Sequence, residues 1–307
     1  MNRPACRDER PHRRSVAAWL AGSRPRTLPA AVVPVVVGTA VGWSAHRPGG
    51  LLIWRASGAL VVALAIQIGT NYHNDYADGL KGTDDSRVGP ARLVASGAAT
   101  PGAVKAAALA SFAVAAAAGV GLAAVTTWWL VALGAVCFAA GWLYTGGPRP
   151  YGYLGLGELF VFGFFGVVAT TGSAFVQGVT VASGGMGLAL LASVPVGLLA
   201  TALLEANNLR DVAGDASAGK RTLAVRLGRR RASWLYVGCI AGAAAGSIVL
   251  APWRPWVLLT LLALPLAVRP VRGVLDGAEG KRLLPVLGAT GRIQIVMGVL
   301  LAIGVIL

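Results

Sequence analysis

The sequence predicts an all-α membrane protein, because it is hydrophobic along its whole length and carries few charged residues. Of its 307 residues, 56% are hydrophobic and 13% are charged, and the mean hydropathy is +0.68. So little polar sequence cannot cover the surface of a water-soluble fold. Apolar stretches able to cross roughly 30 Å of hydrocarbon recur throughout, and no polar stretch is long enough for a separate domain. We therefore expect one membrane domain over residues 1–307.

Hydropathy, with Gly, Pro and charged residues marking the ends, predicts nine transmembrane helices. Their expected ranges are 27–45, 52–73, 102–124, 128–145, 154–176, 186–206, 232–251, 256–269 and 290–307. The first begins near Thr27, is long for a signal-peptide core and leads into further helices, so we expect no cleavage there.

The distribution of Lys and Arg predicts the orientation of the helices. With a cytoplasmic N-terminus, only Arg47, Arg55 and Arg254 of the 27 basic residues fall on the far side. Residues 1–26 then form a basic cytoplasmic segment. A net charge of +15 would suggest nucleic acid binding in a soluble protein, but here the positive-inside bias explains it. We expect no nucleic acid partner.

All twelve acidic residues fall on the cytoplasmic side in this orientation. Two connections on that side, roughly 74–101 and 207–231, are longer than the others and carry most of the acids. Long polar loops are where functional residues often lie. We therefore expect the site to lie in these two connections.

The first motif, NDYADGLKGTDD, occupies residues 74–85 at the end of the second predicted helix. Polar side chains recur at steps of three or four and would share one face if the helix continued, namely Gln67, Asn71, Asn74 or Asp75, and Asp78. Gly79 and Gly82 follow, where the chain can turn back and bring Asp84 or Asp85 toward the same point.

The second motif, NNLRDVAGD, occupies residues 207–215 at the end of the sixth predicted helix. Asn207, Asp211 and Asp215 recur every four residues, as the polar residues of the first motif do. Four helices separate the motifs, so helices 1–4 and 5–8 are interpreted as a divergent duplication. Such a duplication would place the two motifs opposite one another across a central cavity.

Repeated carboxylates on one side of a helix repel one another unless a cation neutralises them. A single Asp at a membrane surface would also fit a solvated loop or a helix end, but two matching clusters favour a site. Carboxylate and amide oxygens suit Mg²⁺, which binds through a few carboxylates and the phosphate oxygens of a substrate. Basic residues near the motifs, each of which would also fit a membrane anchor, are Lys81, Arg87, Arg92, Arg210, Lys220 and Arg221.

At these residues the sequence resembles the UbiA-type intramembrane prenyltransferases, which carry an N-D-x-x-D motif after helix 2 and a D-x-x-x-D motif after helix 6. Three stretches, NDYADGLKGTDDSRVGP (74–90), YTGGPRPYGYLGLGE (144–158) and SRPRTLPAAVVPVVVGTA (23–40), resemble the branch of that family acting on 1,4-dihydroxy-2-naphthoate in menaquinone synthesis. The acid after Asp78 is six residues on, wider than the shorter family spacing, so either Asp84 or Asp85 fits as a ligand.

The resemblance implies about nine helices around a cavity that opens to the cytoplasm and sideways into the lipid bilayer of a bacterial cytoplasmic membrane. It implies polyprenyl diphosphate as donor, 1,4-dihydroxy-2-naphthoate as acceptor, Mg²⁺ as cofactor, and a demethylmenaquinone as product after loss of CO₂. Tyr144 could stabilise an allylic cation, although an interfacial aromatic anchor fits equally. Arg149 could reach the diphosphate, and Arg24 and Arg26 could hold the acceptor carboxylate or serve only as orientation signals.

The expected site residues fall into three groups. The expected metal ligands are Asn74, Asp75, Asp78, Asp84, Asn207, Asp211 and Asp215. The expected catalytic residues are Asp75, Asp78, Asp211, Asp215 and Tyr144. The expected substrate-binding residues are Arg24, Arg26, Asn71, Lys81, Arg149, Asn208, Arg210 and Lys220.

Other functions fit the sequence less well. A CDP-alcohol phosphotransferase needs both Asp pairs within one short stretch, whereas here they lie more than a hundred residues apart. A transporter should carry its ionisable groups near the bilayer midplane rather than at one face. Within the resembling family, a prenyltransferase acting on 4-hydroxybenzoate or another aromatic acid is the alternative.

Overall fold

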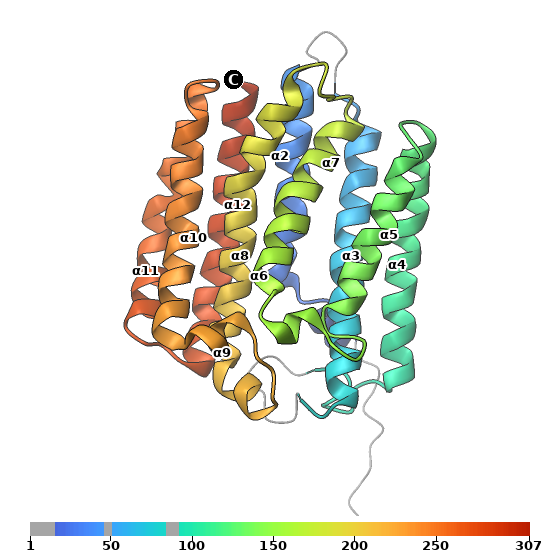
Figure 1. Ribbon diagram of the computed structural model, residues 1–307, viewed down its shortest axis with the longest axis vertical. Coiled ribbons are helices and arrows are strands. Elements are labelled where there is room, and N and C mark those ends of the chain that lie inside the picture. Colours follow the sequence, from blue (N-terminus) through green and yellow to red (C-terminus); the bar gives the residue numbers. More distant parts are fainter. Residues whose placement is uncertain (1–15, 46–50, 84–91) are drawn as a thin grey trace, which may run out of the picture.

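A computed structural model of the protein describes residues 16–45, 51–83 and 92–307, and these residues form helices and no strands. The long helices run side by side in one bundle, with α4 and α5 at one edge and α11 at the other (Figure 1). Arg47, Asp84, Asp85 and Arg87, which the sequence interpretation uses, lie outside these ranges.

Every predicted transmembrane segment corresponds to a helix or to a run of helical segments. These are α2 (Pro29–Ala45), α3 (Ile53–Leu80), α4 (Pro101–Ala124), α5 (Trp129–Leu143), α6 (Gly157–Val161) with η4 (Phe162–Val168) and α7 (Ala169–Val176), α8 (Gly185–Ser217), α10 (Arg229–Leu250), η5 (Pro255–Ala263) with α11 (Leu264–Leu275), and α12 (Leu284–Ile306). Short segments connect them, namely α1 (Val16–Gly22), η1 (Pro25–Thr27), η3 (Tyr151–Leu154), α9 (Leu223–Leu227) and η6 (Gly280–Leu283).

The predicted all-α, multi-spanning fold is confirmed. Within the described residues, seven helices are long and apolar enough to cross a membrane, or eight if the bent pair Val16–Thr27 and Pro29–Ala45 counts as one span. The apolar helix α5 is shorter, with 15 residues. The prediction of about nine helices therefore agrees with the bundle. The segment predicted at 256–269 is longer than expected and runs through η5 and α11 to Leu275.

Five exposed tryptophans gather at one end of the bundle. At the N-terminal ends of α3, α5 and η5 and in the turn after α10, large parts of Trp54, Trp128, Trp129, Trp253 and Trp256 are accessible. Tryptophan prefers the boundary between hydrocarbon and water, because its ring is apolar and its N–H is polar. This end lies opposite the end that carries the aspartate motifs.

The two helices that carry the motifs extend further than the sequence predicted, and this corrects the two loops. Helix α3 continues to Leu80 and α8 to Ser217, so residues 74–80 of the first motif and the whole of the second lie on the last turns of helices rather than in long connections. The polar residues of these turns stay helical because neighbouring segments form hydrogen bonds and ion pairs with their side chains, as described below. Each helix ends close to a glycine with positive φ, Gly82 at 67° and Gly219 at 74°.

Close packing holds α7 against α2. A Cβ atom at Gly38 of α2 would lie only 2.2 Å from the carbonyl oxygen of Thr170, and one at Gly42 would lie 2.3 Å from Cβ of Gln177. Small residues allow two membrane helices to approach at backbone distance. The approach fixes one wall of the space enclosed between α2, α3 and α8.

Candidate active site

A cavity of about 580 Å³ runs through the bundle between α2, α3, α4, α5, α7 and α8. Most of its wall is apolar, and its lining includes Val35, Ala59, Leu122 and Val176. Near the motif end of α3 and α8 the lining becomes polar, with Arg24, Gln67, Asn71, Asn74 and Asn207. Ala59 and Asn74 on α3 both line the cavity, and fifteen helical residues separate them by about 22 Å. The cavity therefore has a long apolar body and one polar end.

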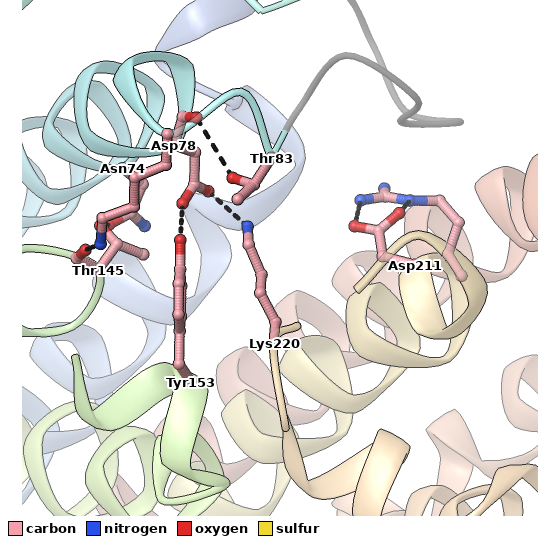
Figure 2. A network of polar contacts seen from close by, with 9 residues as sticks. Asn74, Asp78, Thr83, Thr145, Tyr153, Asp211 and Lys220 are labelled. Carbon is pink, nitrogen blue, oxygen red and sulfur yellow. Dashed lines mark hydrogen bonds and ion pairs between the residues drawn. The ribbon is translucent and has the colours of Figure 1, made fainter. Parts of the chain in front are cut away.

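Asn74 and Asp78 lie one turn apart on α3, and residues from distant parts of the chain bind both. The hydroxyl of Thr145 donates to Oδ1 of Asn74 at 2.6 Å. Asp78 accepts a short hydrogen bond from the Tyr153 hydroxyl at Oδ1, and its Oδ2 lies 3.0 Å from Nζ of Lys220. Figure 2 shows these side chains pointing toward one another.

Asp75 has a different environment, although it lies between these two residues in the motif. It is fully buried, and its two carboxylate oxygens accept hydrogen bonds from the backbone N–H groups of Leu93 and Val94, at 2.8 and 3.1 Å. These bonds attach the segment that precedes α4 to the side of α3. The structure thus turns Asp75 toward this segment, whereas Asn74 and Asp78 bond to Thr145, Tyr153 and Lys220.

The second motif is arranged around an ion pair within α8. Arg210 donates two hydrogen bonds to the carboxylate of Asp211, from Nε at 2.8 Å and from Nη2 at 2.7 Å, and both side chains are buried. Asn207 lines the cavity, and its amide donates to the Leu203 carbonyl. Asn208 donates to Oε1 of the buried Glu158 at 2.7 Å.

Lys220 connects the two motifs. Its backbone N–H donates to the carbonyl of Asp215 at 2.8 Å, which turns the chain back after α8. Its ammonium group then reaches Asp78 on α3. The side chain of Asp215 itself is partly exposed. The motifs predicted to face one another are therefore joined at the same end of the bundle.

The predicted substrate-binding cations occupy unequal positions. Lys81 donates to the Thr145 carbonyl at 3.0 Å, close to the first motif. Arg24 lines the cavity, and its Nη2 atom is buried without a hydrogen-bond partner among the described residues. Arg26 and Arg149 are exposed. Geometry thus favours Arg24 over Arg26 as a group that meets a ligand in the cavity.

The backbone holds Arg24 in an unusual conformation. Its φ of 54° is in the left-handed region, which a non-glycine residue adopts only when the surroundings enforce it. Asn71 supplies part of that enforcement, because its amide donates to the Ser23 carbonyl at 2.9 Å and to the Thr27 hydroxyl at 3.3 Å. Asn71 therefore lines the cavity and also fastens the bend between α1 and α2 that carries Arg24.

Four aromatic rings form a row on the cavity wall. Tyr144, which follows α5, meets Tyr151 edge-on at 5.4 Å, Tyr151 stacks on Phe160 at 4.0 Å, and Phe160 stacks on Phe164 at 5.9 Å. Burial raises the pKa of the Tyr151 hydroxyl, so this group stays neutral at physiological pH. The row provides ring faces next to the polar end of the cavity.

Sequence reasoning missed two residues of the site. Thr145 and Tyr153 bind the first motif from 71 and 75 residues away, so helical periodicity gives no sign of either contact. Both lie in the stretch 144–158, whose resemblance to the naphthoate branch was the available signal.

The oxygen donors at the two helix ends suit a hard cation. Asn74 and Asp78 on α3 and Asn207 and Asp211 on α8 supply amide and carboxylate oxygens, the ligand types of Mg²⁺. The ion pairs with Lys220 and Arg210 demonstrate that the two buried carboxylates take up positive charge. In the part of the chain that the structure describes, no three His, Cys, Asp or Glu side chains gather into a metal site.

The fold and this cavity define a multi-spanning membrane protein with an internal cavity that is apolar along most of its length and polar at one end. Residues 31–284 match the UbiA prenyltransferase family, and the chain belongs to that family. The 1,4-dihydroxy-2-naphthoate octaprenyltransferase of Mycobacterium tuberculosis is 48% identical over 94% of this chain and 96% of its own length. The protein of that name from Escherichia coli K12 is 36% identical over 94% and 95%.

Solved structures agree on the fold. A UbiA homolog from Aeropyrum pernix K1 superposes with a TM-score of 0.69 at 16% identity, covering 90% of this chain and 96% of its own. A UbiA homolog from Archaeoglobus fulgidus bound to DMAPP and Mg²⁺ gives a TM-score of 0.60, also at 16% identity, over 94% and 99%.

Proposed function

We propose that this protein transfers a polyprenyl group from polyprenyl diphosphate to 1,4-dihydroxy-2-naphthoate, releasing pyrophosphate and CO₂ and forming a demethylmenaquinol, the reduced form of demethylmenaquinone. The observation that carries the proposal is the cavity, whose apolar body leads to a polar end between the two motifs. A donor with a hydrocarbon tail and a diphosphate head likewise has a long apolar part and one polar end. Relatives that match this chain over 94% of its length carry the name of this activity.

The donor binds with its tail among the apolar helices and its diphosphate at the ends of α3 and α8. Lys81 within the first motif and Lys220 beside it supply charge-assisted hydrogen bonds to phosphate oxygens. We propose Mg²⁺ as the cofactor, held by Asn74, Asp78 and the second motif; when bound, it neutralises the charge of the departing pyrophosphate.

Loss of pyrophosphate leaves an allylic cation, which needs stabilisation and protection from water. The ring of Tyr144, in the aromatic row of the cavity wall, offers its negative face for this purpose. The electron-rich ring of the acceptor then attacks the cation at the carbon that bears the carboxylate, and departure of CO₂ restores aromaticity. No covalent bond to the protein is needed.

Arg24 is the group we assign to the acceptor carboxylate. Its buried Nη2 atom at the cavity has no partner among the described residues, and a carboxylate is the natural acceptor for a guanidinium group. A carboxylate held at the polar end would direct the naphthalene ring toward the allylic carbon. Positioning of this kind accounts for much of the rate in a reaction between two bound substrates.

The protein is a membrane protein, and we propose the bacterial cytoplasmic membrane with the N-terminus and both motifs on the cytoplasmic side. Lys81, Lys220 and the run Arg229–Arg231 lie toward the motif end of the bundle, whereas Arg55 and Arg254 lie at the other. Cysteines placed in the 212–231 segment of a Cys-free variant should react with an impermeant reagent only from the cytoplasmic side. Labelling from outside would overturn this orientation.

The test of the proposed function is an acceptor panel with purified protein, one polyprenyl diphosphate and Mg²⁺. We expect a higher kcat/KM for 1,4-dihydroxy-2-naphthoate than for 4-hydroxybenzoate, and a product that mass spectrometry finds without the carboxylate. Preference for the benzoate, or a product that keeps its carboxylate, would leave a prenyltransferase with a different acceptor.

A further inference from the structure

Tyr153 lies where three functional parts of the chain meet. It belongs to η3, the short segment between α5 and α6. Its hydroxyl donates to Oδ1 of Asp78 in the first motif. Nζ of Lys81 lies 4.8 Å from its ring centroid, and Nζ of Lys220, which follows the second motif, lies 4.9 Å from it. A single tyrosine therefore contacts an expected metal ligand and both lysines expected to bind diphosphate.

Backbone hydrogen bonds on two sides hold the segment that carries Tyr153 in place. The carbonyl of Tyr153 accepts from the N–H of Arg221 at 3.1 Å, and the N–H of Gly152 donates to the Tyr144 carbonyl at 3.0 Å. A Cβ atom at Gly152 would lie 2.7 Å from that same carbonyl oxygen, so a side chain there would displace the segment. The tyrosine is thus attached on one side to the end of α5 and on the other to the segment after α8.

The hydroxyl and the ring of Tyr153 can do different work. A carboxylate has about four acceptor positions, so a hydrogen bond to Oδ1 fixes its orientation and still leaves lone pairs for a cation. Metal-binding carboxylates are commonly oriented in this way by a second group. The aromatic ring attracts ammonium groups through its negative face, and this attraction needs no hydroxyl.

We propose that Tyr153 is a positioning residue of the diphosphate site, in which the hydroxyl orients Asp78 toward Mg²⁺ and the ring holds the ammonium groups of Lys81 and Lys220 in place for the diphosphate. The proposal rests on the proposed function, since it takes Asp78 as a metal ligand. A purely structural tyrosine would only attach η3 to α3, and its loss would lower stability without altering ligand affinities.

Two substitutions separate the two contributions. Tyr153→Phe removes the hydroxyl and keeps the ring, whereas Tyr153→Leu removes both. Tyr236→Phe is the matched control, because it deletes a buried hydroxyl that bonds Thr290 between α10 and α12. All three are measured as full-length protein in lipid nanodiscs, with the melting temperature as the check on folding.

The probes are Mg²⁺ and inorganic pyrophosphate, followed by titration calorimetry. For Tyr153→Phe we expect the Mg²⁺ concentration that gives half-maximal pyrophosphate binding to rise about 10- to 100-fold. At saturating Mg²⁺ its pyrophosphate affinity should stay near that of the wild type. For Tyr153→Leu the affinity at saturating Mg²⁺ should fall by a further factor of about 2 to 30, as expected for lost cation–π contacts.

The kinetics give a second measurement of the same division. The KM for polyprenyl diphosphate should rise in Tyr153→Leu more than in Tyr153→Phe, whereas the KM for the acceptor should stay unchanged in both. A wild-type Mg²⁺ midpoint in either folded variant would overturn the proposal and leave Tyr153 a structural contact. Asp78→Asn tests the proposed function separately. An unchanged Mg²⁺ midpoint for pyrophosphate binding in that variant would show that Asp78 is not a metal ligand.

Discussion

The two aspartate motifs look alike in sequence, yet their carboxylates have different kinds of partner. Asp211 forms an ion pair with its neighbour Arg210 on the same helix, so α8 supplies both charges. Asp78 is bound by Tyr153 and Lys220, which lie on η3 and beyond the end of α8. The Arg210–Asp211 pair of the second motif is therefore formed within one helix, whereas the partners of Asp78 come from other segments of the bundle.

The difference suggests a division of labour between the two helix ends. A locally paired carboxylate keeps its position when distant segments move, because both partners share one backbone. A carboxylate whose partners lie on distant segments changes its position when those segments move. Its position therefore depends on whether these segments are packed together. We expect substitution of Asp78 to be felt by η3 and the segment after α8, and substitution of Asp211 to be felt first by Arg210 on α8.

Removal of divalent metal should produce the largest effect, because it acts on both motifs together. Excess EDTA is expected to abolish prenyl transfer, and added Mg²⁺ to restore it. The melting temperature should change little, since Lys220 and Arg210 pair with Asp78 and Asp211 and can neutralise both carboxylates. Full activity in EDTA would show that neither the end of α3 nor the end of α8 needs a metal ion for the reaction.

Asp78→Asn and Asp211→Asn test the comparison itself. Each substitution removes one charge without changing shape, and each should lower kcat/KM by about 10²- to 10³-fold through lost stabilisation of the leaving group. The Asp211 variant also leaves Arg210 buried without its carboxylate partner, which should lower the melting temperature. Near-normal activity in either variant would show that the corresponding helix end does not hold the diphosphate.

Much of the fold follows from the sequence, because a bilayer requires long apolar segments and places charge in a regular way. All nine predicted segments are helical, and the errors lie at their ends, most clearly where α3 and α8 continue into the polar motifs and where α11 runs on to Leu275. Hydropathy ends a transmembrane helix at its last apolar turn, but the helix itself ends where backbone bonding stops. That point depends on partners such as Glu158 for Asn208, 50 residues away.

The expected site residues could be predicted as a group but not individually. Neighbouring residues on a helix point about 100° apart, so periodicity could not choose between Asn74 and Asp75. The choice depends on the segment containing Leu93 and Val94, which covers Asp75. In the same way, sequence places Arg24 and Arg26 together, and only the bend after α1 sends one of them to the cavity.

Arg24→Ala should produce an intermediate effect confined to the acceptor. Loss of a hydrogen-bonded charge pair is expected to raise the KM for the naphthoate about 10- to 100-fold while the KM for polyprenyl diphosphate stays within about twofold. Arg26→Ala, two residues away at an exposed position, is the comparison and should have the smaller effect. A larger rise in KM in Arg26→Ala, or equal rises for both substrates, would contradict the assignment of Arg24 to the acceptor. Arg24 and Arg26 would then serve only as orientation signals.

Asp75→Asn should have the smallest effect on catalysis and separates the two kinds of aspartate most sharply. The carboxylate of Asp75 accepts two backbone N–H groups, whereas an asparagine has one oxygen and an NH₂ group that cannot accept. One buried N–H therefore loses its partner, which should cost about 1–3 kcal/mol of stability. The melting temperature should fall, and the Mg²⁺ midpoint for pyrophosphate binding should stay closer to the wild-type value than in Asp78→Asn. An unchanged melting temperature together with lost Mg²⁺ dependence would make Asp75 a metal ligand, and the first motif would then bind metal through adjacent residues of α3.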